Sequence, residues 1–315
     1  MTSKAASSTL QAIGNTPIVR LNKVVGPHAA EVYVKLEYFN PTGSYKDRVA
    51  LAMIEEAEKR GELKPGMTVV EYTGGSTGSS LAFVCSVKGY PFHVVSSDAF
   101  AKEKLQSMEA FGAELEIVPS AGGQVTPDLT PRMIRRAKEI SESKPSYFTN
   151  QLSNTDAAKG YEPVARELLD QLDSPIHAFC ASVGTAHMLM GVARVLRRLN
   201  PSPRIVALEP SSSPVISAGM KGAHRVEGIG IGLVPPLFDK SLCDEVRAID
   251  ETKSRQMARR LAREEGIFTG TSSGMNVQAA CDLAWELGPG HTVVTVAVDT
   301  GLKYLNGDLF RPEIR

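Results

Sequence analysis

The chain has 315 residues, and 35 lysines and arginines balance 35 aspartates and glutamates, so its formal net charge at pH 7 is zero. Without a basic excess or a long basic run, the sequence lacks the field that nucleic acid or an anionic membrane requires, and we expect neither as a partner. No apolar run reaches the roughly 18 residues of a membrane span. We therefore expect a cytoplasmic protein with small neutral or zwitterionic partners.

Residue types that bind metals are scattered along the chain. The four cysteines (Cys85, Cys180, Cys243 and Cys281) form no C-x-x-C pair, and the six histidines show neither H-x-x-x-H nor H-E-x-x-H spacing. We expect reduced thiols of a cytosolic protein and no metal site.

Short apolar runs rich in β-branched residues alternate with longer amphipathic stretches, a pattern typical of parallel strands joined by helices. The expected strands are 31–38, 67–72, 92–97, 113–120, 176–182, 204–210 and 291–299. The expected helices are 44–60, 78–88, 101–111, 129–143, 155–171, 185–199, 251–265 and 273–287. This alternation predicts an α/β fold.

The order of these elements suggests two lobes. One strand precedes the helix at 44–60, and the strand–helix units from 67 to 120 look self-contained. We predict a smaller, substrate-binding domain at 44–150, inserted into a discontinuous larger domain formed by 1–43 and 151–315.

Lys46 lies near the start of a predicted helix, in NPTGSYKDRVALAMIEEAEKRG. A helix N-terminus carries partial positive charge and repels a cation by roughly 0.3–1 kcal/mol. Ser44 is a suitable N-cap, and Asp47 completes a pattern similar to a capping box. The helix field and any desolvation favour a neutral amine, the form that attacks a carbonyl to give a Schiff base. This stretch alone leaves open a solvent-exposed lysine.

A glycine-rich turn, Thr73 to Gly78, follows the expected strand 67–72. Amides at the start of the next helix, with the hydroxyls of Thr73, Ser76 and Thr77, would hold a carboxylate or phosphate. An ordinary strand-to-helix turn is the alternative.

Three further segments have the same character. Residues 183–187 lead from a strand into a helix, where His187 is either a phosphate donor or a plain helix-start residue. GTSSG at 270–274 opens another helix, whereas GIGIGL at 228–233 precedes VPP and is a poor dinucleotide fingerprint. Together with Lys46, these loops predict a crevice for a phosphorylated carbonyl cofactor and a small acid.

Seven motifs occur in the order found in cysteine synthases and their cystathionine β-synthase-like relatives: NPTGSYKDR, EYTGGSTG, NQLSN, SVGTAHMLMG, GIGIG, GTSSG and DTGLKYLNGDLF. The chain resembles this family of pyridoxal-phosphate enzymes, of the tryptophan-synthase β type, from Ile13 to Phe310. The resemblance implies the fold of type II enzymes, two three-layer αβα lobes with mostly parallel sheets. It also implies pyridoxal 5′-phosphate as cofactor, a homodimer and a small lobe that closes over substrate.

The resemblance further implies roles for individual residues. Lys46 would form the Schiff base and later move the substrate's α-proton, and the Ser272 hydroxyl would meet the pyridine nitrogen. Further cofactor contacts are expected at Ser76 and, for the phosphate, at Gly184, Thr185, Ala186, His187 and Met188. Substrate contacts are expected at Thr73, Gly74, Gly75, Thr77, Gln151 and Gly228.

The chain departs from the family pattern around the cofactor. The substrate loop usually reads T-S-G-N-T-G, whereas here Gly74 replaces the serine and Ser76 the asparagine. Met188 replaces a hydroxyl residue of the phosphate loop, and Tyr45 precedes the lysine where a small aliphatic residue is common. These changes bear on the substrate and on the outcome of the reaction more than on the fold.

The resemblance implies β-elimination or β-replacement on a small L-amino acid through an aminoacrylate. We expect a cysteine synthase-like transferase or lyase that converts O-acetyl-L-serine and sulfide into L-cysteine and acetate. A neutral serine at the pyridine nitrogen suits prompt loss of a β-substituent. The alternatives are a cysteine desulfhydrase, a synthase with another amine or thiol nucleophile, a serine/threonine dehydratase, and a non-catalytic binding or regulatory homologue.

Overall fold

The computed structural model describes residues 5–124, 126 and 128–311. The fold is α/β, as predicted, and it divides into two compact units. The first unit contains Asn40–Gly160 with the described residues up to Ile13, and the second contains Gly14–Phe39 with those from Tyr161 onward. The predicted domain bounds, 44–150 within 1–43 and 151–315, and the closing motion stay predictions.

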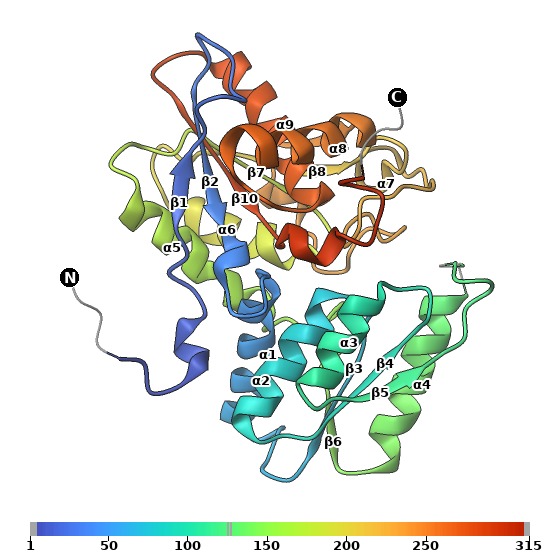
Figure 1. The fold of residues 1–315 in the computed structure, drawn as a ribbon. Helices are drawn as coiled ribbons and strands as arrows, with labels where there is room; N and C mark the ends of the chain where they lie inside the picture. The colour runs from blue at the N-terminus through green and yellow to red at the C-terminus, as the bar shows by residue number, and fades with distance from the viewer. Residues whose placement is uncertain (1–4, 125, 127, 312–315) are drawn as a thin grey trace. The chain divides into compact units, whose positions relative to one another are not determined.

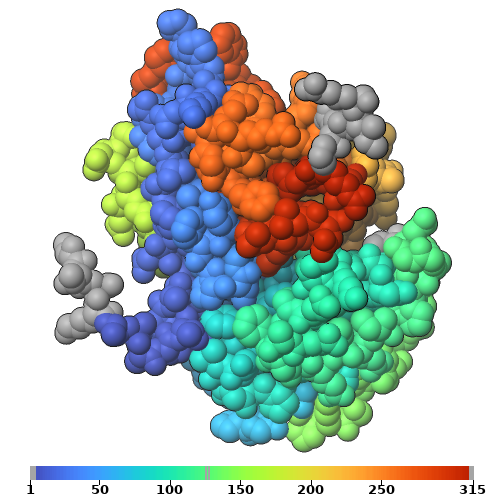
Figure 2. Space-filling model, viewed as in Figure 1, coloured from blue at the N-terminus to red at the C-terminus, as the bar shows by residue number. Residues whose placement is uncertain are grey.

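A parallel four-stranded sheet, ordered β5-β4-β3-β6, forms the centre of the first unit (Figure 1). Its strands are β3 (Thr68–Tyr72), β4 (Phe92–Ser96), β5 (Glu114–Ile117) and β6 (Ser146–Phe148). Its helices are α1 (Lys46–Arg60), α2 (Ser76–Lys88), α3 (Lys102–Ala110) and α4 (Leu129–Ser143). Helix α4 packs its apolar side chains on one face of the sheet, and α1, α2 and α3 lie on the other. Side chains of α2 and α3 cover that side of the unit in the space-filling view (Figure 2).

The second unit has a six-stranded sheet, ordered β1-β2-β10-β7-β8-β9 and parallel except for β1. Its strands are β1 (Ile18–Arg20), β2 (Glu31–Leu36), β7 (Ala178–Ser182), β8 (Arg204–Pro210), β9 (Glu245–Ile249) and β10 (Thr292–Ala297). Its helices are α5 (Glu162–Gln171), α6 (His187–Leu196), α7 (Val215–Ala218), α8 (Glu251–Arg260) and α9 (Thr271–Leu287). The apolar side of α9 packs with β2, β7 and β10 in one buried cluster.

Several element boundaries differ from the prediction. The strand expected at 31–38 ends at Leu36, because Glu37–Phe39 forms a 3₁₀ turn. The helix expected at 155–171 begins at Glu162, with proline at its second position. Helix α8 ends at Arg260 and continues as a π-helical turn, Leu261–Glu265. Further 3₁₀ turns are Thr9–Ala12, Lys159–Tyr161, Lys240–Leu242 and Gly301–Tyr304.

The strands β1, β6 and β9 were absent from the prediction. Two of them have three residues, and β9 carries charged residues at alternate positions in EVRAI. Each is held by hydrogen bonds to a neighbouring strand rather than by an apolar pattern of its own. Pairing of this kind is decided by tertiary contacts.

Within the described part of the chain, no helix combines the length and apolar character of a membrane crossing. The same residues contain no group of three or more His, Cys, Asp or Glu side chains placed to hold a metal ion. All four cysteines are free, and burial raises the pKa of Cys180 and Cys281 to about 12. These two thiols are therefore protonated at neutral pH.

Candidate active site

Lys46 lies in the first turn of α1, as predicted, and is its first residue, two positions after the expected start; its side chain is half-buried. The Lys46 Nζ atom lies 4.9 Å from the centre of the Tyr45 ring. The predicted capping differs in detail: Ser44 Oγ accepts the Lys46 N–H at 3.1 Å, and Tyr45 is the N-cap. The Asp47 carboxylate accepts the N–H and hydroxyl of Thr42, at 2.8 and 2.6 Å. Asp47 thus closes the turn before the helix instead of capping it.

Residues 73–75 join β3 to α2 at the carboxyl edge of the sheet, and Ser76 to Gly78 form the first turn of α2. The first hydroxyl of this loop, Thr73 Oγ1, accepts the Gly75 N–H at 3.2 Å. A Cβ on Gly74 would lie 2.3 Å from atoms of the Phe100 ring, and one on Gly78 would lie 2.7 Å from Thr73. The ring of Phe100 therefore occupies the space that a side chain at residue 74 needs.

Gln151 follows β6 and reaches the same loop from a distant part of the sequence. Its Oε1 accepts the Thr77 hydroxyl at 2.7 Å, and its Nε2 donates to the Tyr72 carbonyl at 3.3 Å. Parallel strands place their carboxyl ends at one edge, so the segments after β3 and β6 meet there. The first unit thus brings together two residues predicted to contact substrate.

Glu71, which sequence reasoning missed, supports Gln151 from inside the sheet. Its side chain is fully buried, and it accepts hydrogen bonds from the Tyr72 N–H, the Gln151 N–H and the Thr149 hydroxyl. Burial raises the pKa of Glu71 to about 7, although these hydrogen bonds oppose the increase. The one signal in the sequence was a carboxylate within the apolar strand TVVEY.

In the second unit, residues 183–186 connect β7 to α6. The Val183 N–H donates to the Leu208 carbonyl at 2.9 Å, which leaves the amides of 184–186 for an anion. The first hydrogen bond into α6 runs from the Met190 N–H to the Ala186 carbonyl, so the amides before it do not use helix acceptors. Ala186 has a left-handed φ of 70°. A Cβ on Gly184 would lie 2.4 Å from the Gly228 carbonyl oxygen, which places these two predicted residues side by side.

Both side chains at the start of α6 are buried. The His187 Nδ1 atom lies 2.9 Å from the Thr185 hydroxyl, so this histidine orients a hydroxyl of the loop. Met188 is also buried.

Ser272 lies in the first turn of α9 and is buried, only 4% exposed. Within the described residues its hydroxyl has no hydrogen-bond partner. The neighbouring Ser273 Oγ accepts the Val298 N–H at 2.8 Å, and the Thr269 hydroxyl contacts the Asp299 carbonyl at 2.7 Å. These contacts hold the turn, and Ser272 remains available to a ligand.

Asn276 is a second residue that sequence reasoning missed. Its Oδ1 accepts the Ser182 N–H at 2.8 Å, and its Nδ2 donates to the Val296 carbonyl at 2.9 Å. The side chain is fully buried. It fixes α9 to the ends of β7 and β10, and so relates Ser272 to the anion-binding loop.

Residues 9–299 match a protein family described as pyridoxal-phosphate dependent enzyme. The chain belongs to this family. It is 42% identical to a cysteine synthase of Staphylococcus aureus over 312 residues, covering 98% of this chain and 99% of that protein.

Solved structures of the family share the fold. A crystal structure of O-ureido-L-serine synthase has a TM-score of 0.90 and 35% identity, covering 98% of this chain and 96% of that one. A hydrogen sulfide-producing enzyme of Fusobacterium nucleatum has a TM-score of 0.89 and 35% identity, covering 96% of this chain and 99% of that one. The sequence-based expectations of a pyridoxal-phosphate enzyme of the cysteine synthase group, with its fold, are confirmed.

The residues present fit the family's cofactor. The amides of 184–186 and the start of α6 suit a phosphate, and the close approach of Gly184 to Gly228 requires glycine. Ser272 of the second unit has a buried hydroxyl, and Lys46 of the first unit has a primary amine, the group that condenses with an aldehyde.

Proposed function

We propose that this chain is a cysteine synthase-like enzyme that converts O-acetyl-L-serine and sulfide into L-cysteine and acetate. The β-carbon would lose its bond to the acetate oxygen and gain a bond to sulfur. The similarity to the S. aureus cysteine synthase, which extends over nearly all of both chains, supports this reaction. The observation that carries it in the structure is the Thr77–Gln151 pair at the carboxyl edge of the first sheet.

That pair suits the α-carboxylate of an amino acid. Gln151 Nε2 carries two protons, and the Tyr72 carbonyl uses one of them. The second proton and the Gly74 amide would bind the carboxylate, whereas the Thr77 hydroxyl, which donates its one proton to Gln151 Oε1, would hold the Gln151 side chain in place. Thr73 would hold the loop, since its hydroxyl accepts the Gly75 N–H.

Bound pyridoxal phosphate would supply an electron sink for the substrate's α-carbon. We assign its phosphate to Gly184, Thr185, Ala186, His187 and Met188. The Ser272 hydroxyl would form a hydrogen bond with the pyridine nitrogen. Ser76 would contact the cofactor, and Gly228 would contact the substrate. Lys46 would bind the aldehyde carbon and, once released, take and return the proton at the α-carbon.

A different outcome at the same site is the second candidate. The substrate loop departs from the family pattern at two positions, Gly74, which the Phe100 ring covers, and Ser76. The chain is also similar to an O-ureido-L-serine synthase and to a hydrogen sulfide-producing enzyme. Another nucleophile, cysteine desulfhydration or serine/threonine dehydration would use the same carboxylate contacts.

Product analysis separates these reactions. The purified enzyme is incubated with O-acetyl-L-serine with and without sulfide, and with L-cysteine, L-serine or L-threonine alone. We expect L-cysteine and acetate in equal amounts only when sulfide is present. Sulfide release from cysteine as the sole activity, or pyruvate from serine, would replace the synthase proposal.

The covalent role of Lys46 has its own test. Reduction with borohydride followed by digestion and mass spectrometry is expected to find a pyridoxyl group on Lys46. The Lys46→Ala variant should lose turnover by several orders of magnitude and keep its circular dichroism spectrum. Label on a different side chain would refute this assignment.

We also propose that the protein is a cytoplasmic homodimer. The family resemblance supports the dimer, and the four free cysteines favour a reducing compartment. Light scattering after size-exclusion chromatography would measure the dimer's mass, and fractionation of the source cells would locate the protein.

A further inference from the structure

The buried carboxyl group of Glu71 holds the turn that carries Gln151 by hydrogen bonds to the backbone. Glu71 Oε1 accepts the Tyr72 N–H at 2.8 Å, and Glu71 Oε2 accepts the Gln151 N–H at 2.9 Å. Each oxygen therefore satisfies one backbone amide. Glu71 is 0% exposed, so water cannot replace either contact.

Local contacts shape the backbone directly before Gln151. Asn150 has a left-handed φ of 42°, which asparagine adopts more readily than most residues, and its carbonyl accepts the N–H groups of Ser153 and Asn154 at 3.0 and 3.1 Å. The position of Gln151 itself also depends on a contact from a distant part of the chain. The contact that reaches the Gln151 main chain comes from Glu71.

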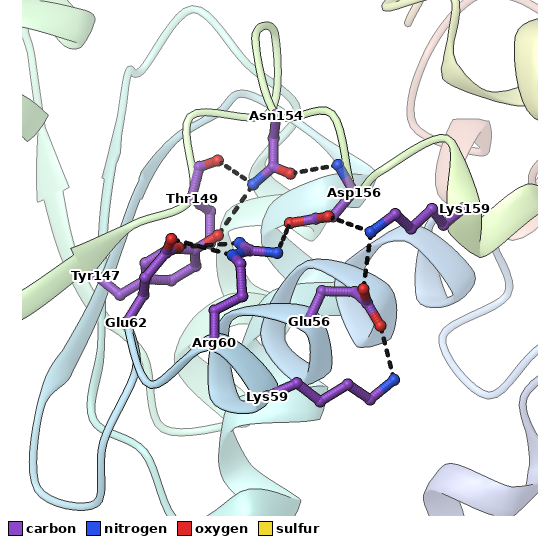
Figure 3. A network of polar contacts seen from close by, with 9 residues as sticks. All are labelled: Glu56, Lys59, Arg60, Glu62, Tyr147, Thr149, Asn154, Asp156 and Lys159. Atoms are coloured by element: carbon purple, nitrogen blue, oxygen red, sulfur yellow. Dashed lines mark hydrogen bonds and ion pairs between the residues drawn. The ribbon is translucent and has the colours of Figure 1, made fainter.

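The outer side of the same turn is tied down separately (Figure 3). Asn154 Nδ2 donates to the Thr149 carbonyl at 2.8 Å, and Asn154 Oδ1 accepts the Asp156 N–H at 2.9 Å. The Thr149 hydroxyl lies 2.7 Å from Glu71 Oε2 and 3.1 Å from the Val70 carbonyl. Asn154 thus orders the outside of the turn, and Glu71 sets the position of Gln151 on the inside.

We propose that Glu71 is a positioning residue for the substrate's α-carboxylate, acting through Gln151. By fixing the Gln151 main chain, it keeps the amide side chain on Thr77 and directs the remaining Nε2 proton toward the carboxylate. The inference rests on the proposed carboxylate site, and it adds a residue that does not itself touch substrate.

A carboxyl group is required because both of its oxygens accept. A protonated Glu71 keeps this ability, since its proton goes to Thr149, whose hydroxyl then donates to Val70. An amide has one acceptor oxygen, so Glu71→Gln turns an NH₂ group toward one of the two backbone N–H groups. That mismatch displaces the turn without changing the size of the side chain.

Kinetics of the holoenzyme test the proposal in three variants: Glu71→Gln, Gln151→Ala and the double mutant. We expect Glu71→Gln to raise the KM for the amino acid by about tenfold, the loss typical of a hydrogen bond to a charged group. The KM for the nucleophile and kcat should change little. Because Glu71 acts through Gln151, the double mutant should match Gln151→Ala. Multiplicative effects in the double mutant would overturn the proposal.

Glu209→Gln is the matched control. Glu209 is a buried glutamate of the second unit that accepts the N–H groups of Ile216 and Ser217, at 2.7 and 2.9 Å. Its amide variant loses the same kind of acceptor, and its KM for the amino acid should stay near the wild-type value. An equal rise in KM for both variants would mean a general loss of stability and would refute a positioning role.

Hydrogen exchange distinguishes this proposal from the proposed function. In Glu71→Gln, amide exchange in the peptide containing residues 149–154 should accelerate, whichever amino acid is the substrate. A wild type inactive on O-acetyl-L-serine would refute the proposed reaction alone, and the kinetic comparison would then use the amino acid that is turned over. Unchanged exchange in this peptide would refute the role of Glu71.

Discussion

Gly74 and Phe100 show how the residue type at one position is limited by a neighbour in space. In the family pattern residue 74 is serine, but here the Phe100 ring fills the space where that side chain would begin. Phe100 also packs against the apolar cluster beneath α4. In this chain the Phe100 ring therefore lies against the substrate loop where a side chain at residue 74 would otherwise begin.

Adding a methyl group at residue 74 should be costly. We expect Gly74→Ala to lower the free energy of unfolding by about 1–3 kcal/mol, the usual cost of overpacking. Adding Phe100→Ala in the same chain should recover part of that loss. Urea unfolding followed by fluorescence or circular dichroism measures both.

Gly75→Ala is the control for that experiment. A Cβ at residue 75 would meet only Lys104 Cδ, at 4.0 Å, and the φ of −154° lies outside the left-handed region that favours glycine. Its effect should stay below about 1 kcal/mol, the usual range for changes at a helix N-cap. Equal losses at residues 74 and 75 would contradict the role assigned to Phe100.

Glu71 should make stability depend on pH. Burial raises its pKa from 4.5 to about 7, so the folded state favours the protonated form. The stabilisation by this proton is complete below pH 4.5 and is lost as the pH rises through 7. A pKa increase of this size corresponds to roughly 3 kcal/mol.

The measurement compares urea unfolding of wild type and Glu71→Gln at pH 5 and pH 8. Wild type should lose more stability than the variant between these values. The adjacent Tyr72 does not interfere, since burial raises its pKa further above the ordinary value. Parallel losses in the two proteins would show that Glu71 does not titrate in this range.

At the scale of elements, the carboxyl-terminal half of α1 is joined to the segment after β6 (Figure 3). Arg60 Nη1 contacts Asp156 Oδ2 at 2.7 Å, and Lys159 Nζ contacts Asp156 Oδ1 at 2.9 Å. The Asp156 side chain is only 6% exposed, whereas the other partner of Arg60, Glu62, is 51% exposed. The helix that begins at Lys46 and the segment that carries Gln151 thus share one buried carboxylate.

Asp156→Ala should therefore destabilise far more than Glu62→Ala. The first variant removes the nearly buried carboxylate that binds two cations, and we expect a loss of about 1.5–3 kcal/mol, the usual contribution of hydrogen bonds to a charged group. The second removes an exposed ion pair, which solvent screens, so its loss should be small. Denaturant unfolding of both variants measures the two losses in free energy of unfolding. Similar losses would mean that the Asp156 carboxylate is solvated in solution.

For the whole molecule, the cofactor should act as a stabilising ligand. A ligand that binds only the folded state, at about 100 times its Kd, adds about 2.7 kcal/mol. Removing pyridoxal phosphate should lower the melting temperature, and adding it back should restore the value. Differential scanning calorimetry measures both steps.

Pyridoxal, which lacks the phosphate, is the control ligand for that experiment. It keeps the aldehyde for Lys46 but gives residues 184–188 no anion, so it should restore less of the melting temperature. Equal recovery with both compounds would contradict the phosphate site assigned to that loop.

Much of the fold and part of the site were predictable from the sequence. The long alternation of apolar runs and amphipathic stretches marked the main strands and helices, because burial on both faces of a parallel sheet leaves a continuous apolar pattern. The family motifs indicated the cofactor and placed Lys46 at a helix start. The short strands β1, β6 and β9 lacked such a pattern, since their partners decide whether they form.

Sequence alone determined the α/β class, the pyridoxal-phosphate family and the lysine at the start of α1. These depend on local patterns, which a chain carries along its length. Tertiary structure alone decided that Phe100 lies over Gly74, that Glu71 holds Gln151, and that Asn276 links two strand ends. Contacts between residues far apart in sequence arise only when parallel strands bring their ends together, so no local pattern records them.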